Sequence, residues 1–115
     1  MNLITMTNLT KKKCIPCEEG GDPLTREEAE KLLLEVNDWA LIDDAHLLAK
    51  SFHFNNFVES INFVNKIAAI AEEEGHHPDL TISYSDVGVE LSTHAIEGLS
   101  ENDFILAAKI DEIQK

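Results

Sequence analysis

Apolar and polar residues alternate along two neighbouring segments, and this alternation constrains the fold more than any other feature of the chain. Apolar side chains occupy every second position from residue 80 to 84 and again from 87 to 91. Alternation of this kind is typical of β-strands that bury one face. Ser85-Asp86 lies between the two runs and fits a tight turn. The sequence therefore predicts an antiparallel hairpin.

Three other segments, residues 25–38, 55–74 and 101–113, carry apolar residues at the spacing of amphipathic helices. The first begins at a capping box formed by Thr25 and Glu28. The expected inner faces consist of Ala29, Leu32, Leu33 and Val36 in the first helix, of Phe57, Ile61, Val64, Ala68 and Ala71 in the second, and of Leu106, Ala107, Ile110 and Ile113 in the third.

Two acidic residues lie on these expected inner faces. Glu72 follows Ala68 by one turn and is expected to face inward, whereas Glu73 and Glu74 point elsewhere. Asp103 opens the inner face of the last helix, although a carboxylate at that position can also serve its own helix start.

Residues 39–43 and 46–54 are expected to form two more strands. The resulting order, α-β-β-α-β-β-α, predicts an α+β fold: a four-stranded antiparallel sheet with three helices on one face. Residues 1–23 are expected to form an N-terminal arm, and residues 24–115 a single domain. Pairing of an edge strand with a second copy would protect that edge, so we expect a homodimer with a continuous sheet.

The charge balance argues against several classes of partner. The chain of 115 residues holds 22 acidic and 9 basic residues, a net charge of -13. Binding to nucleic acid or to an anionic membrane needs clustered basic residues, so neither is expected. Because no apolar run reaches the roughly 20 residues that span a bilayer, and no signal peptide is visible, we expect a cytoplasmic protein.

Three histidines are expected to meet at one end of the sheet. His76 and His77 lie where the second helix leads into the hairpin, and His94 lies where the hairpin ends. Antiparallel strands bring the start of one strand beside the end of the next. The three imidazoles should therefore approach one another, with Asp103 nearby.

The spacing of these histidines favours proton transfer over metal binding. Pro78 favours extended backbone at His77, so His76 and His77 should point to opposite sides. A zinc site is the alternative, but the spacing lacks a helical i, i+4 pair. Imidazoles without a metal suit general acid–base catalysis, since their ordinary pKa is ~6.5. His46 and His53 lie away from this cluster and are expected to be structural or exposed.

Cys14 and Cys17 have the spacing of half a zinc site or of a redox pair. A second such pair, which a closed structural zinc site would need, is absent from the sequence. We therefore favour two reduced thiols in the N-terminal arm.

These residues resemble the pterin-4a-carbinolamine dehydratase family over about residues 24–113. The resemblance is carried by Phe52-His53-Phe54-Asn55-Asn56-Phe57, Glu72-Glu73-Glu74-Gly75-His76-His77-Pro78, Tyr84, Leu91-Ser92-Thr93-His94, Gly98-Leu99-Ser100 and Asp103. It implies the same α+β fold, oligomers built on a dimer, and a lyase that uses no cofactor. The substrate would be 4a-hydroxytetrahydrobiopterin or a related carbinolamine left by an aromatic amino acid hydroxylase, and the products would be quinonoid dihydropterin and water.

The resemblance also implies the site residues. The catalytic histidines would be His76, His77 and His94, and the residues that bind or orient the substrate would be Glu72, Ser92, Thr93 and Asp103. Our hypothesis is that His76 and His94 act as acid and base, while His77 mainly holds the pterin. Family members commonly carry Asn or Asp in place of Gly75 and an aromatic residue in place of Leu80, differences that could alter pterin affinity or substrate choice.

A protein-binding module without catalysis is the alternative function. Relatives of this family also act as dimerisation partners of a homeodomain transcription factor, and an acidic surface is compatible with protein partners. The sequence leaves open which pterin is the physiological substrate and whether the oligomer is a dimer or a tetramer.

Overall fold

The hairpin predicted from the alternation is present, but its turn comes one residue earlier than expected. In the computed structural model, which describes residues 9–15 and 21–113, β3 is Asp79–Ser83 and β4 is Asp86–Leu91. Ser83 pairs with Asp86, so Tyr84 and Ser85 form the turn. Tyr84 has a φ of 51°, the left-handed backbone that a two-residue hairpin turn needs. The expected turn at Ser85-Asp86 is therefore wrong, because Tyr84 continues the alternation without continuing the strand.

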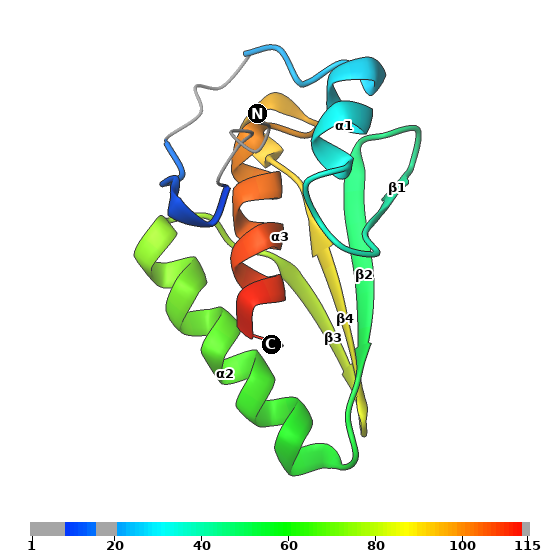
Figure 1. Cartoon of the computed structure of the whole chain (residues 1–115), viewed down its shortest axis with the longest axis vertical. Coiled ribbons are helices and arrows are strands. Elements are labelled where there is room, and N and C mark those ends of the chain that lie inside the picture. The colour runs from blue at the N-terminus through cyan, green and yellow to red at the C-terminus, as the bar shows by residue number, and fades with distance from the viewer. Residues whose placement is uncertain (1–8, 16–20, 114–115) are drawn as a thin grey trace, which may run out of the picture.

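All four strands form one antiparallel sheet, as predicted. β1 (Ala40–Ile42) pairs with β2 (Leu47–His53), and β2 pairs with β4. The strand order is β1-β2-β4-β3, so that β1 and β3 are the two edge strands among the residues described. Figure 1 shows the long central strands β2 and β4 running beside each other.

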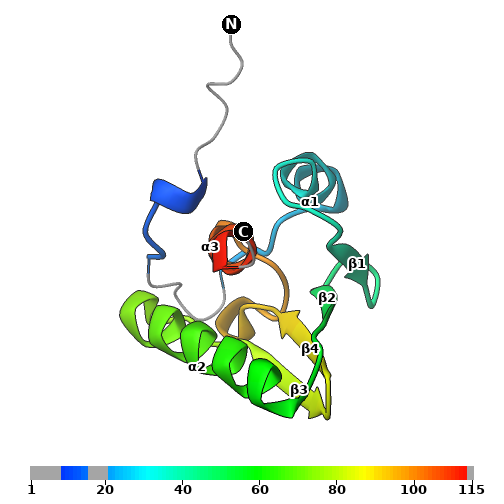
Figure 2. The same cartoon turned by 60° about the horizontal axis from the view of Figure 1, so that its bottom comes forward.

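Three helices lie on one face of this sheet (Figures 1 and 2). They are α1 (Arg26–Leu33), α2 (Phe57–Glu74) and α3 (Glu101–Ile113), and α3 lies between the other two. α3 buries a nearly continuous run from Asn102 to Ala108, because helices flank it and the sheet lies behind it. The predicted fold class and element order are confirmed.

The capping box of α1 is confirmed, but the helix is shorter than expected. The Glu28 backbone N–H donates to the Thr25 hydroxyl over 3.1 Å, and the Thr25 N–H donates to the Glu28 carboxylate over 2.9 Å. Regular α-helix ends at Leu33, and tight turns carry the chain to Val36 instead of the expected end at Asn37-Asp38. These turns bury Val36 and leave Leu34 85% exposed.

The buried stripe of α2 differs from the expected one. Ser60, Phe63, Ile67 and Ala71 are buried, whereas Phe57 is 48% exposed. Apolar residues occur all round this helix, so periodicity alone does not select the inner face. The choice is made by packing: the Phe63 ring lies 4.7 Å from Phe52 and 5.0 Å from Phe54, measured between ring centroids.

The described part of the arm packs against the domain. The short 3-10 helix η2 (Leu9–Lys11) contacts α3, and Leu9 is only 3% exposed within the core. The division into an arm of residues 1–23 and a domain of residues 24–115 remains a prediction. Among the described residues, none of the helices has the length and apolar character that a membrane span requires.

Candidate active site

The three predicted histidines line one pocket of about 370 Å³. The pocket lies at the end of the sheet where α2 leads into β3 and where β4 ends. Its lining residues are Ile15, Gly75, His76, His77, Pro78, Asp79, Ser92, Thr93, His94, Ala95 and Asn102. The convergence expected from antiparallel pairing is therefore present.

Gly75 ends α2 and so sets the backbone direction of the two histidines that follow it. It caps α2 with a φ of 67°, a left-handed conformation that is strained for residues with a Cβ atom. Both the Gly75 N–H and the His76 N–H donate to the Ala71 carbonyl, at 2.9 and 3.2 Å. This cap stops the helix and turns the chain directly into β3.

His76 is held by a buried carboxylate. Its Nε2 lies 2.6 Å from Oδ1 of Asp103, whose side chain is 0% exposed. Oδ2 of Asp103 accepts from the Thr93 hydroxyl at 2.8 Å and from the Ser100 backbone N–H at 3.0 Å. Asp103 thus serves its own helix start, which was one of the two roles that the sequence suggested. It also fixes the His76 ring. When Nε2 donates to Asp103, Nδ1 is the ring nitrogen that can exchange a proton with a bound molecule.

His77 points to a different partner. Its Nε2 lies 2.7 Å from Oε2 of Glu72, and the two side chains are 58% and 78% exposed. His76, by contrast, is 12% exposed. The adjacent imidazoles therefore diverge as expected, one toward the buried Asp103 and one toward the solvent.

The segment after β4 supplies a further part of the pocket wall. Ser92 and Thr93 line the pocket, and His94 begins the short 3-10 helix η3 (His94–Ile96) with its side chain exposed. Thr93 pairs with Gly98, which closes the loop that contains η3. His94 also borders a neighbouring hollow of about 310 Å³ that His46 lines.

The expectation that Glu72 faces inward and Glu74 does not is wrong. Glu72 is exposed, whereas the Glu74 side chain is 1% exposed and lies 2.6 Å from the Lys109 ammonium. Burial alone raises the pKa of a carboxyl group, but hydrogen bonds from Lys109 and from the Cys14 backbone outweigh it, so the pKa of Glu74 is lowered. The rotation of α2 that buries Phe63 and Ile67 brings Glu74 to the inner face.

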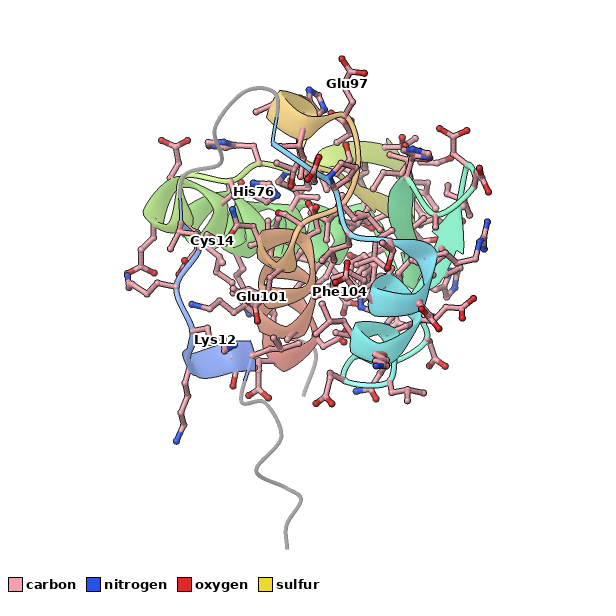
Figure 3. The ribbon with its side chains drawn as sticks, turned by 90° about the horizontal axis from the view of Figure 1, so that it is seen from above. Lys12, Cys14, His76, Glu97, Glu101 and Phe104 are labelled. Atoms are coloured by element: carbon pink, nitrogen blue, oxygen red, sulfur yellow. The ribbon has the colours of Figure 1, made fainter. Side chains whose placement is uncertain are left out.

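Two contributors to the pocket were not found from the sequence. Asn102 is 4% exposed and makes two hydrogen bonds with the backbone of Ile15, and both residues line the pocket. Their contact joins positions 87 residues apart, and no local pattern signals it. Figure 3 shows the described arm, with Cys14 labelled, at the same end of the molecule as His76.

Cys14 is a half-buried thiol that donates to the Asn102 carbonyl at 3.6 Å. Burial, together with the nearby charge of Glu74, raises the pKa of Cys14 to about 12. This opposes the thiolate that redox and metal chemistry require. Cys17 lies outside the described residues, and within them no group of three His, Cys, Asp or Glu side chains is arranged to hold a metal ion.

The remaining histidine lies far from this chemistry. His53 Nδ1 is 2.6 Å from Oδ1 of Asp86 near the tip of the hairpin, and both side chains are largely exposed. The expectation of a structural or exposed histidine away from the cluster holds for His53. His46 is exposed too, but it borders the same hollow as His94, so the expectation that it lies away from the cluster is wrong.

These features define a class of protein: an α+β domain whose pocket, at one end of the sheet, is lined by histidines and carboxylates. The pattern of the family described as Pterin 4 alpha carbinolamine dehydratase matches residues 22–113. The chain belongs to the pterin-4a-carbinolamine dehydratase family, a family of hydro-lyases.

The sequence of this chain matches curated bacterial relatives over nearly their whole length. The chain is 56% identical to a protein of Rickettsia canadensis, with coverage of 92% of this chain and 97% of the relative. It is 46% identical to a protein of Halorhodospira halophila, again covering 92% and 97%. The names of both relatives assign them, provisionally, as pterin-4-alpha-carbinolamine dehydratases.

Two solved structures are similar. A transcriptional coactivator/pterin dehydratase from Brucella melitensis has a TM-score of 0.77 and 31% identity, covering 82% of this chain and all of that one. A pterin dehydratase-like protein described as a RuBisCO assembly factor of the alpha-carboxysome has a TM-score of 0.57 and 25% identity, covering 65% and 87%.

Proposed function

We propose that this chain removes water from a 4a-hydroxytetrahydropterin to give the quinonoid dihydropterin. The single observation that carries the proposal is the pocket in which His76, His77 and His94 converge, with His76 fixed by the buried Asp103. The family membership supports the same reaction.

The chemistry requires two proton transfers. The C4a–O bond breaks with its electron pair on oxygen, and a general acid protonates the departing hydroxide to give water. A general base takes the proton of N5, and the N5–H electron pair forms the new C4a=N5 double bond. Imidazoles can perform both steps near neutral pH.

We assign these roles to His76 and His94, which both line the pocket. Asp103 holds the proton on Nε2 of His76, which leaves Nδ1 to exchange a proton with the substrate. His77 is the more exposed of the adjacent pair and holds the pterin at the mouth, with Glu72 orienting its ring. Ser92 and Thr93 line the wall beside His94 and bind the substrate.

In this proposal the pterin is the substrate and no cofactor takes part. The carbinolamine would come from an aromatic amino acid hydroxylase, whose tetrahydropterin is thereby recycled. We further propose a cytoplasmic homodimer or tetramer, with residues 24–115 as the functional domain.

The test is to follow dehydration of synthetic 4a-hydroxytetrahydrobiopterin by absorbance, with and without a chelator. We expect acceleration that ignores the chelator and is lost in His76→Ala and in His94→Ala. His53→Ala is the matched control, since His53 also pairs with an aspartate but lies at the hairpin tip. Normal turnover in both pocket variants would refute the assignment of roles.

A protein-binding function is the second candidate, because one similar structure is titled a coactivator and another an assembly factor. Absence of acceleration by folded wild-type protein, together with a stable protein complex that survives His76→Ala, would favour it. Stoichiometric zinc in protein purified without a tag would instead favour a metal site.

A further inference from the structure

The described arm is fastened at two points beside the pocket. The Ile15 N–H donates to Oδ1 of Asn102 at 3.0 Å, and Nδ2 of Asn102 donates to the Ile15 carbonyl at 2.6 Å. The Cys14 N–H donates to Oε1 of Glu74 at 2.8 Å. Both anchoring side chains are buried, so these hydrogen bonds are shielded from water.

The two anchors stand next to the acid–base pair in the sequence. Asn102 precedes Asp103 directly, and Glu74 lies two positions before His76. The arm is therefore attached to the same two segments that carry the hydrogen bond between His76 and Asp103. Any shift of the arm relative to the pocket would have to break contacts with these segments.

The anchoring fixes the backbone of Ile15 while its side chain stays open to solvent. Ile15 is 68% exposed, and it lines the pocket with the three histidines. An aliphatic side chain this exposed contributes little to the stability of the hydrophobic core. The other lining residues are mostly polar, and Ile15 is the largest aliphatic side chain among them.

We propose that Ile15 forms the apolar wall of the pterin pocket and determines substrate affinity, with Asn102 as the residue that positions it. A bicyclic pterin buries the carbon faces of its rings when it binds, and an aliphatic side chain on a fixed backbone offers a surface for one of them. This inference rests on the proposed function, because it names how that pocket holds its pterin.

The test combines steady-state kinetics of 4a-hydroxytetrahydrobiopterin dehydration with binding of unreactive 7,8-dihydrobiopterin. Ile15→Ala should raise KM and the dihydrobiopterin Kd about tenfold while kcat stays nearly constant, since the wall lies outside the proton transfers. Ile15→Leu should restore both. Asn102→Ala should raise KM in the same way because it releases the Ile15 backbone.

Two control variants separate the wall from general effects. Lys12→Ala removes an exposed ion pair between the same arm and Glu101, and Leu34→Ala removes an aliphatic side chain that is more exposed than Ile15 and does not line the pocket. Both should keep wild-type KM and Kd. An active wild type with unchanged KM and Kd in Ile15→Ala would overturn the inference alone. A wild type without dehydratase activity would overturn the proposed function and the inference with it.

Discussion

At the scale of single residues, the hydrogen bond between Asp103 and His76 matters most to the proposed chemistry. Asp103→Asn keeps the size of the side chain but removes the charge that selects the His76 ring proton. We expect kcat to fall by roughly 10²–10⁴-fold, the range of a lost general acid or base.

The control is Asp86→Asn, which breaks an aspartate–histidine pair with the same 2.6 Å distance on an exposed surface. Turnover there should stay within about twofold, since exposed pairs contribute little. Thermal unfolding of both variants shows whether they are folded. A folded Asp103→Asn protein with wild-type kcat would contradict the role given to this carboxylate.

Cys14 gives a second prediction at this scale. Because its pKa is raised to about 12, its thiolate is scarce at pH 8 and alkylation by iodoacetamide should be slow. In a Cys17→Ser protein, mass spectrometry should show labelling of Cys14 slower than in denaturant by roughly 10³-fold, the difference that the change in thiolate fraction implies. Equal labelling rates of Cys14 in the native and the unfolded protein would contradict the raised pKa of this thiol.

At the scale of elements, the end of α2 explains why a glycine suits position 75. The position needs a left-handed backbone, which glycine adopts freely and asparagine adopts more readily than other residues. Apart from the adjacent residues, no atom of the described part of the chain lies within 4 Å of a Cβ placed there, so these residues leave space for a side chain.

Gly75→Asn should therefore leave the free energy of unfolding nearly unchanged, whereas Gly75→Ala should lower it by about 1–2 kcal/mol through backbone strain. Urea unfolding of the two variants checks this. An alanine variant as stable as wild type would show that α2 can end in another conformation.

The ion pair between α2 and α3 should make stability depend on pH. The pKa of Glu74 is lowered in the folded protein, so its contribution is present above the ordinary carboxyl pKa of ~4.3 and is lost as the pH falls through the lowered value. Glu74→Gln should be less stable than wild type at pH 7, and the difference should shrink toward pH 3. Glu101→Gln, which breaks an exposed pair, is the control for urea titrations across this range.

Prediction from sequence worked where local pattern and burial agree. Alternation predicted β3 and β4, the capping box predicted the start of α1, and antiparallel geometry predicted that His76 and His94 share one pocket. It failed on α2, because apolar residues surround that helix and only contacts with Phe52 and Phe54 decide which side is buried.

The pocket wall formed by the arm was beyond local patterns for a related reason. A polar contact between residue 15 and residue 102 depends on how the chain packs as a whole, and neither residue stands out in its own segment. The pocket histidines, to which we assign the proton transfers, could be found from the sequence since their side-chain chemistry is unusual. Ile15 and Asn102 could not be found in this way, because isoleucine and asparagine serve many purposes.

At the scale of the whole molecule, the expected homodimer has a definite geometry to test. Among the described strands the edges are β1, with three residues, and β3, with five. We expect the longer edge to pair with a second copy, because more backbone groups and the 39% exposed Ile82 gain partners there. Sedimentation should then show a dimer that Ile82→Lys weakens by at least about tenfold, as a charge forced against an apolar contact predicts.

Ile42→Lys is the matched control, since Ile42 is 37% exposed on the other edge strand. A dimer weakened only by this variant would place the interface on β1, and a monomeric wild type would contradict the expectation altogether. Each copy carries a net charge of -13, so two copies repel each other at low ionic strength. Raising the salt concentration screens that repulsion and should tighten the dimer, whereas an interface held mainly by ion pairs would loosen.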